Sequence, residues 1–517
     1  MGESVMLFCR HLKLEHNRIR QLTPAICQCV SLQQLSMTGN PLEEIPWKMI
    51  RLRELHNFTF DVAPLSRAFP PDILEQGRLG LFSLLSAFTE SQKSGKLWLS
   101  KRGLKDIHPS LSSIICGLQV LDLSANAIES VSESSLHYGT PFETSLKVLD
   151  LRRNKLTRLA SGIGKATSLQ VLMLQHNLLT RLPVTIALLT NLECLEVDDS
   201  KMEFPPPHIC AQGAEVVVRF LSHFIDALST HELVLDGYEL HSLPVEVTHI
   251  PSLTKISLCN NIFSDLTQPF KMLRDVPALR SINLEENRVS VLPDLLISLS
   301  GIRELLLQNN PLSRLPVWID EMAVLESISF GGPNVKADWI HGSLCQMDLL
   351  VRLQIHDVGL KSFDVRYMYL PLLESLSLKN NKLTCFPCVL MEYRRLEFLC
   401  LQLNLIDRIS DEEIMALRNL QHLDVSGNPL AFLPVGLGAL RELKLVEFDA
   451  DLVDGPPQSI NDAGMESVLQ FYRDLVQSWE TGRLKISNRR LLDVPIEVGL
   501  LGTSLCRPYT IFHFKMG

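Results

Sequence analysis

The sequence predicts an α/β solenoid, in which short parallel strands of successive coils stack along one face. Three observations indicate this class. One apolar pattern recurs along most of the chain, an asparagine recurs at a fixed place within it, and a longer motif interrupts it three times. At about 150 residues per domain, 517 residues would suggest three or four compact domains. The repeats indicate instead that the length of the chain reflects the number of stacked coils and not the number of compact domains.

The basic coil is clearest in residues 169–186, which read LQVLMLQHNLLTRLPVTI. Numbered from Leu169 as step 1, apolar residues occupy steps 1, 4, 6, 11, 14 and 18, asparagine occupies step 9 and proline step 15. Copies that start at Cys9 and Leu32 are 23 residues apart (32 − 9). Because steps 4 and 6 flank one residue, a short strand turns both inward and turns steps 5 and 7 outward.

The asparagine at step 9 follows each predicted strand. Its amide both donates and accepts, so it can satisfy backbone groups of its own and neighbouring coils that would otherwise be buried unpaired. We therefore predict a structural ladder of asparagines inside the stack. Its predicted members are Asn17, Asn40, Asn126, Asn154, Asn177, Asn261, Asn287, Asn310, Asn381, Asn404 and Asn428.

A second motif, of the form PPxxIxxxG followed by an amphipathic helix, ends three runs of coils. The helices are predicted to start near Arg78, Ala214 and Met465, and a fresh strand follows each of them. Each helix is expected to cover the open end of a stack or to pack on its outer face.

The domain organisation follows from these terminator helices. Residues 1–93, 94–229 and 230–480 are predicted to form three segments, each with its helix, and residues 481–517 the start of a fourth with a disordered or truncated tail. Neither chain end carries a polar cap, so we expect the sequence to be a fragment, a splice form or an incomplete gene model of a longer protein.

These residues resemble the leucine-rich-repeat superfamily, and the resemblance covers nearly the whole chain. The LPxxI form of the coils is similar to the intracellular Ras-group type of small-GTPase scaffolds, Roco proteins and death-domain adaptors. The resemblance implies a leucine-rich-repeat horseshoe with a parallel β-sheet on the concave face. It also implies a protein partner, such as a small GTPase or a signalling protein.

Composition and charge restrict the partners and the location. Lysine and arginine number 49 against 58 aspartate and glutamate, which gives a net charge of −9 and argues against a nucleic-acid partner. No apolar stretch approaches the roughly 18 residues of a membrane-spanning helix, and the N-terminus is poorly shaped for a signal peptide. We therefore expect a cytoplasmic protein.

The sequence shows no catalytic constellation, and we predict neither an enzyme nor a bound cofactor or metal. The segment Ser161–Lys165 (SGIGK) superficially resembles a phosphate loop but lacks its first glycine and its final hydroxyl residue. Cys385 and Cys388 have the CxxC spacing of redox and metal sites. Phe386 and Pro387 between them occupy the Leu-Pro places of the coil, which favours coincidence.

The remaining candidate for a functional site is the concave surface of the solenoid. Steps 2, 3, 5, 7 and 8 face this side, and equal steps of neighbouring coils form columns across it. An acidic group beside a basic one, with a tryptophan nearby, predicts a protein-docking strip; the alternative is a solvated face. The predicted contact residues are Trp98, Lys147, Arg152, Arg153, Met173, Glu193, Glu196, Asp198, Asp199, Glu232 and Asp236.

Two functions compete for this architecture, and a third is disfavoured. The leading hypothesis is an intracellular scaffold or adaptor without catalytic activity. The second makes the chain the sensor region of a larger Roco-type GTPase or kinase. An extracellular receptor ectodomain is disfavoured by the missing signal peptide and the lack of clustered cysteine caps.

Overall fold

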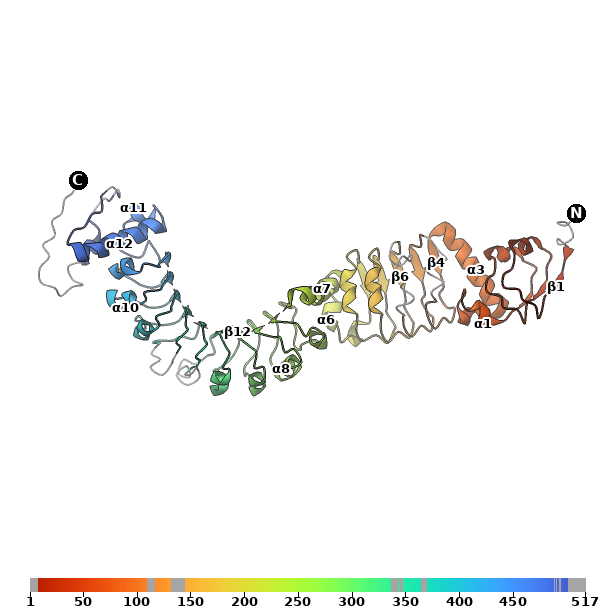
Figure 1. Ribbon diagram of the computed structural model, residues 1–517, viewed down its shortest axis with the longest axis horizontal. Helices are drawn as coiled ribbons and strands as arrows, with labels where there is room; N and C mark the ends of the chain where they lie inside the picture. The colour runs from red at the N-terminus through yellow and green to blue at the C-terminus, as the bar shows by residue number, and fades with distance from the viewer. Residues whose placement is uncertain are drawn as a thin grey trace. The chain divides into compact units, whose positions relative to one another are not determined.

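The computed structural model describes residues 8–108, 117–131, 145–335, 344, 347–363, 370–487, 489, 491 and 494–500. The chain divides into two compact units, residues 1–229 (unit 1) and 230–517 (unit 2). Within each unit the strands of successive coils line up on one side, and short helices lie on the other (Figure 1). The boundary between the units falls where the third segment is predicted to start; the division into four segments stays a prediction.

Unit 1 contains two parallel sheets, one on each side of helix α3 in the sequence. Neighbouring strands are consecutive in the chain and pair in register, so that each coil adds one strand. The first sheet consists of β1 (His11–Lys13), β2 (Gln34–Ser36) and β3 (Asn57–Thr59), and the second of β4 (Lys96–Trp98), β5 (Val120–Asp122), β6 (Val148–Asp150), β7 (Val171–Met173) and β8 (Cys194–Glu196).

Half of the described helices of unit 1 are single 3-10 turns on the side away from the strands. They begin after prolines such as Pro46 and Pro183, whose fixed φ suits the turn. The described helices are η2 (Pro24–Gln28), η3 (Trp47–Arg51), α1 (Val62–Leu65), α2 (Pro71–Leu74), α3 (Gly77–Ser94), η5 (Ser161–Lys165), η6 (Val184–Leu188), η7 (Asp199–Lys201), α6 (Pro207–Cys210) and α7 (Ala214–Thr230).

Helix α3 joins the two sheets of unit 1. It contacts η3 and β3 on one side and β4 on the other. The turn before it is bonded to the coil after it: Gln76 Nε2 donates to the carbonyl of Arg102 at 2.8 Å, and Asp72 Oδ2 accepts from the Lys105 N–H at 3.0 Å. The terminator helix therefore connects one run of coils to the next.

Unit 2 contains a single ten-stranded parallel sheet, again with strands in chain order. Most strands have three residues, and the three in the middle have five. The strands are β9 (Glu232–Val234), β10 (Lys255–Ser257), β11 (Ser281–Asn283), β12 (Glu304–Gln308), β13 (Ser327–Gly331), β14 (Arg352–His356), β15 (Ser375–Ser377), β16 (Phe398–Cys400), β17 (His422–Asp424) and β18 (Leu445–Glu447).

The helices of unit 2 also lie away from the strands, as α8 and α10 show in Figure 1. After α12 the structure describes α13, while residues 501–517, in the predicted disordered or truncated tail, lie outside the described part of the chain. The described helices are η8 (Val245–His249), α8 (Thr267–Leu273), η9 (Asp294–Ser298), η10 (Val317–Glu321), η12 (Cys388–Glu392), α10 (Asp411–Met415), η13 (Val435–Ala439), α11 (Gln458–Asn461), α12 (Met465–Thr481) and α13 (Ile496–Leu500).

The apolar steps form a continuous core. In the coil that begins at Leu169, the residues at steps 1, 4 and 6 are at most 1% exposed. Each coil alone would leave this apolar side in water, so stacking supplies the burial. No helix in the described part of the chain is long and apolar enough to cross a membrane.

The asparagines at step 9 bond to two coils at once. Asn154 Nδ2 donates to the carbonyls of Leu123 in the preceding coil (3.0 Å) and Leu151 in its own (2.9 Å), and its Oδ1 accepts from the Ile128 N–H (3.1 Å). Asn17 differs, because it is exposed and its Nδ2 donates only to carbonyls of its own coil, those of Leu14 and Glu15. Among the described ladder residues, the bonds across coils therefore begin at Asn40.

The residue at step 8, just before the asparagine, adopts left-handed backbone in many coils. Examples are Arg153 (φ 55°), Glu286 (φ 54°) and Leu403 (φ 56°). This conformation is unfavourable for residues with a Cβ, and most of all for bulky ones. The turn is imposed by the stack, and the apolar pattern gives no sign of it.

Candidate protein-binding surface

A single row of side chains crosses the five-stranded sheet of unit 1. Strand pairing aligns Trp98 with Asp122, Asp150, Met173 and Glu196 in turn. Four strand spacings separate the ends of the row by about 19 Å. The side chain of Trp98 is 53% exposed, whereas Asp122 and Asp150 are buried. The register therefore places predicted contact residues from three different coils in one line on one face.

Arg152 carries the main charged contacts of this face. Its Nη2 donates to Asp150 Oδ2 at 2.7 Å and its Nε to Asp150 Oδ1 at 3.1 Å, while its Nη1 lies 4.0 Å from Glu196 Oε2. The bonded carboxylate of Asp150 raises the pKa of the Arg152 guanidinium. Because Glu196 lies two strands away, the arginine bridges β6 and β8 across β7. The predicted basic and acidic groups are thus in contact here.

Asp198 has a structural role that its position in the sequence did not reveal. Its carboxylate accepts from the His176 N–H at 3.0 and 3.1 Å and from Lys201 Nζ at 2.9 Å. Partial burial opposes ionisation, but these donors outweigh it and lower the pKa of Asp198. A carboxylate so engaged holds the turn of the preceding coil, so it is a poorer partner contact than Glu196.

The other predicted residues of unit 1 differ in accessibility. Lys147, Arg153 and Glu193 are exposed. Asp199 is half-buried at the start of η7. Met173 is half-buried too, although its step predicts exposure, because its neighbours in the row are the carboxylates on either side. The exposed part of the surface is therefore narrower than predicted.

Glu232 and Asp236 do not belong to this surface. Glu232 and Asp236 lie at steps 3 and 7, whereas Glu193 and Glu196 lie at steps 2 and 5. In addition, β8 ends a sheet of unit 1 and β9 begins the sheet of unit 2. Columns continue only where strands are hydrogen-bonded, so the predicted acidic group divides between two sheets. Both residues are exposed within unit 2.

Unit 2 has an acidic group that the sequence-based prediction largely missed. We name Asp236, Glu285, Glu286 and Glu304 the acidic patch; they follow β9, follow β11 and begin β12. Their electrostatic influence on one another is direct, since Glu286, Glu304 and Asp236 add to burial in raising the pKa of Glu285. The sequence could have indicated this patch, because acidic residues occupy the outward steps 3, 7 and 8 of neighbouring coils.

The thiols and the loop that resembles a phosphate site show no sign of chemistry. None of the nine described cysteines forms a disulfide, and no described group of histidine, cysteine, aspartate and glutamate could hold a metal ion. Cys385 and Cys388 are both exposed, and Cys388 Sγ lies 3.5 Å from Glu413 Oε1. In Ser161–Lys165, Gly164 packs so closely that an added Cβ would lie 2.5 Å from the Thr185 carbonyl. That loop is part of the stack.

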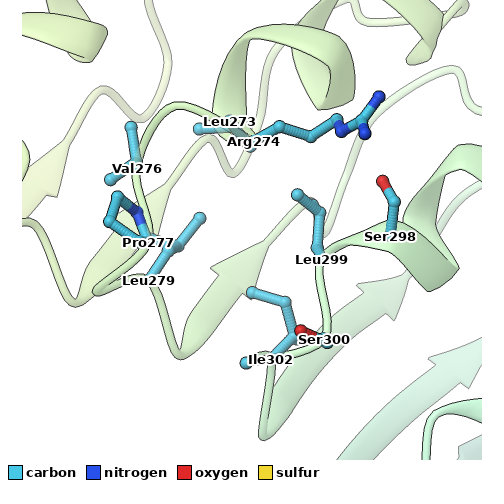
Figure 2. Close-up of a pocket in the computed structure, with 10 residues that line it drawn as sticks. Leu273, Arg274, Val276, Pro277, Leu279, Ser298, Leu299, Ser300 and Ile302 are labelled. Atoms are coloured by element: carbon cyan, nitrogen blue, oxygen red, sulfur yellow. The ribbon is translucent and has the colours of Figure 1, made fainter.

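A hollow in unit 2 lies near the turns that follow α8 and η9 (Figure 2). Leu273, Val276, Pro277 and Leu279 line it together with Arg274, and its volume is ≈ 180 Å³. Small-molecule sites usually measure about 300–1,000 Å³. None of the predicted contact residues lines it. We interpret it as a gap between successive coils.

Family comparison agrees with the coil geometry. Residues 144–202 and 419–440 each match a family model described as leucine-rich repeat. These two stretches are leucine-rich repeats, and the chain has the leucine-rich-repeat solenoid fold. Leucine-rich-repeat arrays generally offer their extended concave surface to protein partners. The fold does not by itself identify the partner, and the Ras-group type within the superfamily stays a proposal.

Named relatives cover parts of this chain. It is 24% identical to leucine-rich repeat serine/threonine-protein kinase 1 of Mus musculus over 273 residues, which are 51% of this chain and 13% of the kinase. It is 28% identical to Toll-like receptor 2 of Bos taurus over 187 residues, 35% of this chain and 22% of the receptor. A solved leucine-rich-repeat protein of Leptospira interrogans is 21% identical, with a TM-score of 0.36, covering 87% of this chain and 94% of its own.

Proposed function

We propose that this chain is a non-catalytic scaffold or adaptor of intracellular signalling that binds protein partners on its strand face. The row from Trp98 to Glu196 supports this above all, because an exposed indole and a charged group stand on one face of one sheet. Tryptophan and arginine are the residue types that contribute most at protein interfaces. A preformed sheet also binds at little ordering cost.

Affinity capture with the full chain tests this proposal. Trp98→Ala is expected to weaken partner binding at least about fivefold, the size of a typical important contact, because it removes the largest exposed side chain of the row. Leu178→Ala is the matched control, since Leu178 is 60% exposed but lies after the strand. Quantitative mass spectrometry would measure retention. Equal retention by wild type and Trp98→Ala would remove the row from the binding surface.

The charged end of the row is tested separately. Glu196→Lys places a cation beside Arg152 and reverses the charge presented to a partner, so partner retention is expected to fall. Glu215→Lys on α7 is the control for the same change in net charge. If both variants lose the same partners, the loss reflects net charge alone.

The partner class that we propose is a small GTPase, and it rests on the resemblance of the LPxxI coils to Ras-group repeats. Purified small GTPases loaded with GDP or with a non-hydrolysable GTP analogue would be presented to the immobilised full chain. Nucleotide-dependent retention that Trp98→Ala reduces would support this class. If signalling proteins are retained but no GTPase is, the scaffold proposal stands and the small-GTPase partner is rejected.

A second candidate function is the regulatory repeat region of a larger Roco-type GTPase or kinase. The match to a mouse kinase over 51% of this chain favours it. Long-read sequencing of transcripts from the native source would test it. A reading frame that joins these repeats to a kinase or GTPase domain would make this the better description.

The proposed location is the cytoplasm, and it is supported by the lack of a disulfide among the nine described cysteines. The match to Toll-like receptor 2 favours a competing receptor role. Imaging of the tagged native protein, with and without membrane permeabilisation, distinguishes the two. Surface staining of unpermeabilised cells would overturn the cytoplasmic proposal.

A further inference from the structure

The acidic patch lies on the strand face of unit 2 because side chains alternate along each strand. In β12, Leu305 and Leu307 are buried in the core, so Glu304 turns to the opposite side. Glu285 follows the buried Leu284 and likewise turns outward from the core. The carboxylates of neighbouring coils therefore stand on the same face of one continuous sheet.

Among the described residues, these carboxylates accept hydrogen bonds from neutral donors only. Asp236 Oδ1 accepts from Ser257 Oγ at 2.6 Å and from the Cys259 N–H at 2.8 Å, and Glu304 Oε2 accepts from Ser281 Oγ at 2.6 Å. Within the described ranges, no ion pair joins the acidic patch to a lysine, arginine or histidine. Its negative charge is therefore uncompensated by the chain around it.

The negative electrostatic potential of the acidic patch affects the pKa of a neighbouring thiol. Burial and then Asp236, Glu286 and Glu285 raise the pKa of Cys259, at the centre of the patch, to about 11. Lys255 on β10 is the one lysine or arginine within strands β9 to β12. Carboxylates in excess on a concave face attract a cationic partner.

Gln308 provides a second, independent observation. It ends β12 at the same step as Glu285 in the preceding coil, and its side chain is 7% exposed. Its amide nitrogen is buried without any acceptor. Glu285 Oε1 lies 3.5 Å from Ser329 Oγ on β13, so its carboxylate reaches across β12, the strand that bears Gln308. A buried amide donor without a partner is rare in folded proteins.

We propose that the acidic patch and Gln308 together bind a basic segment of a partner protein. Lysine or arginine side chains of the segment meet the carboxylates, Glu285 swings from its long contact with Ser329, and a main-chain carbonyl of the segment accepts from the Gln308 amide. This inference rests on the proposed function, because it assumes a protein partner, and it adds the chemistry of that partner. Among described groups of this kind, none is arranged to hold a metal ion, which favours a distributed basic segment over a single cation.

Fluorescence anisotropy with the full chain tests this inference. The probe is a labelled peptide of alternating arginine and serine, and the same peptide with glutamate for arginine is the negative probe. Glu285→Gln combined with Glu286→Gln is expected to weaken binding of the arginine peptide about tenfold. The matched control is Glu321→Gln combined with Glu392→Gln, which removes the same charge at the ends of η10 and η12, away from the strands.

Gln308→Met removes the amide donor and leaves the charge of the acidic patch unchanged, so it tests the two contributions separately. It keeps the volume and net charge of the site, so it is expected to weaken binding about threefold without changing the salt dependence. Glu304→Gln is the reserve variant if the double substitution unfolds, as judged by thermal melting. Failure of the arginine peptide to bind, unchanged binding by the patch variants, or an equal loss in the control pair would each overturn the inference.

The outcomes also separate this inference from the proposed function. If cellular partners depend on Trp98 but the arginine peptide does not bind, the basic-segment inference falls and the scaffold remains. If the peptide binds at the acidic patch but Trp98→Ala retains every partner, the proposed binding surface in unit 1 is rejected and the basic-segment inference in unit 2 stands.

Discussion

At the scale of single residues, the coil is held together by polar groups inside an apolar stack. Each ladder asparagine with a preceding coil supplies donors to two coils and an acceptor to one of them, as Asn177 does through Leu151, Leu174 and Leu156. Leaving such backbone groups unpaired in the interior costs more than the bonds contribute in water. The asparagine is therefore as much a part of the core as the leucines.

Asn154→Ala is expected to lower the free energy of unfolding by about 3 kcal/mol, because two carbonyls and one N–H lose their partner in a buried site. Asn17→Ala is the matched control at the same step, and its exposed site predicts a loss below about 0.5 kcal/mol. Urea denaturation followed by circular dichroism measures both. Equal losses would contradict the importance of the bonds across coils.

The left-handed turn at step 8 gives a stabilising prediction. Leu403 is 47% exposed with φ 56°, so Leu403→Asn is expected to raise the free energy of unfolding by about 1 kcal/mol. Leu405→Asn controls for the loss of exposed apolar surface, since Leu405 is 52% exposed and lacks the positive φ. Its expected change is within about 0.5 kcal/mol. A stabilisation of the same size in both variants would rule out backbone strain as the cause.

At the scale of elements, the long helices end runs of coils by covering their apolar side. In α7 the buried residues Val217, Phe220, Leu221 and Phe224 follow the helical spacing that the sequence predicts. Phe204 packs against Phe220 and Phe224 with ring centroids 5.9 and 5.2 Å apart. These contacts stabilise the last coil before α7.

Helix α12 approaches η13 so closely that only glycine fits between them. A Cβ on Gly438 would lie 2.0 Å from the carbonyl oxygen of Tyr472, so Gly438→Ala is expected to destabilise unit 2 by about 1–3 kcal/mol. Gly499→Ala is the control, because that position in α13 is open, and it is expected to be neutral or slightly stabilising. Thermal unfolding measures both changes. An unaffected Gly438→Ala variant would mean that the helix shifts at little cost.

The raised pKa of Cys259 predicts how the reactivity of its thiol changes with pH. A pKa raised to about 11 keeps the thiol protonated at neutral pH, so iodoacetamide is expected to react slowly with Cys259 until the pH approaches that value. Glu286→Gln removes one cause, lowers the pKa and speeds the reaction at a fixed pH of about 9. Peptide mass spectrometry follows the site, with exposed Cys385 as the internal control. An unchanged rate in Glu286→Gln would mean that Glu286 does not contribute to the raised pKa of Cys259.

At the scale of the whole molecule, each coil contacts mainly its neighbours in the stack. Strand pairing in unit 2 joins only consecutive strands, from β9 to β18. Stability in such an array is approximately a sum of coil and nearest-neighbour terms. Damage to one coil is therefore expected to remain local.

Leu423→Ala, at a fully buried site in β17, is expected to cost about 2–5 kcal/mol locally. Hydrogen exchange should then accelerate in β16 and β18 and stay unchanged in β10. Ile256→Ala, fully buried in β10, is the reciprocal control and should give the reverse pattern. Uniform acceleration across all ten strands would mean that unit 2 opens as a single cooperative block.

The sequence by itself determined the coil. The apolar steps, the asparagines and the three helices follow from spacing within one repeat, and local spacing is what a sequence displays directly. Helices α7 and α12 begin at Ala214 and Met465, where the pattern predicts them, and α3 begins at Gly77, one residue before Arg78.

Only the tertiary structure decided which polar side chains meet. The contact of Arg152 with Glu196 and that of Glu285 with Ser329 each cross an intervening strand, and their distances depend on coil stacking. The same dependence assigned Asp198 to the backbone of His176 and separated Glu232 from Glu196. A repeat fixes the step of a residue within its coil, whereas the reach of a side chain between coils is set by strand spacing and by where each sheet ends.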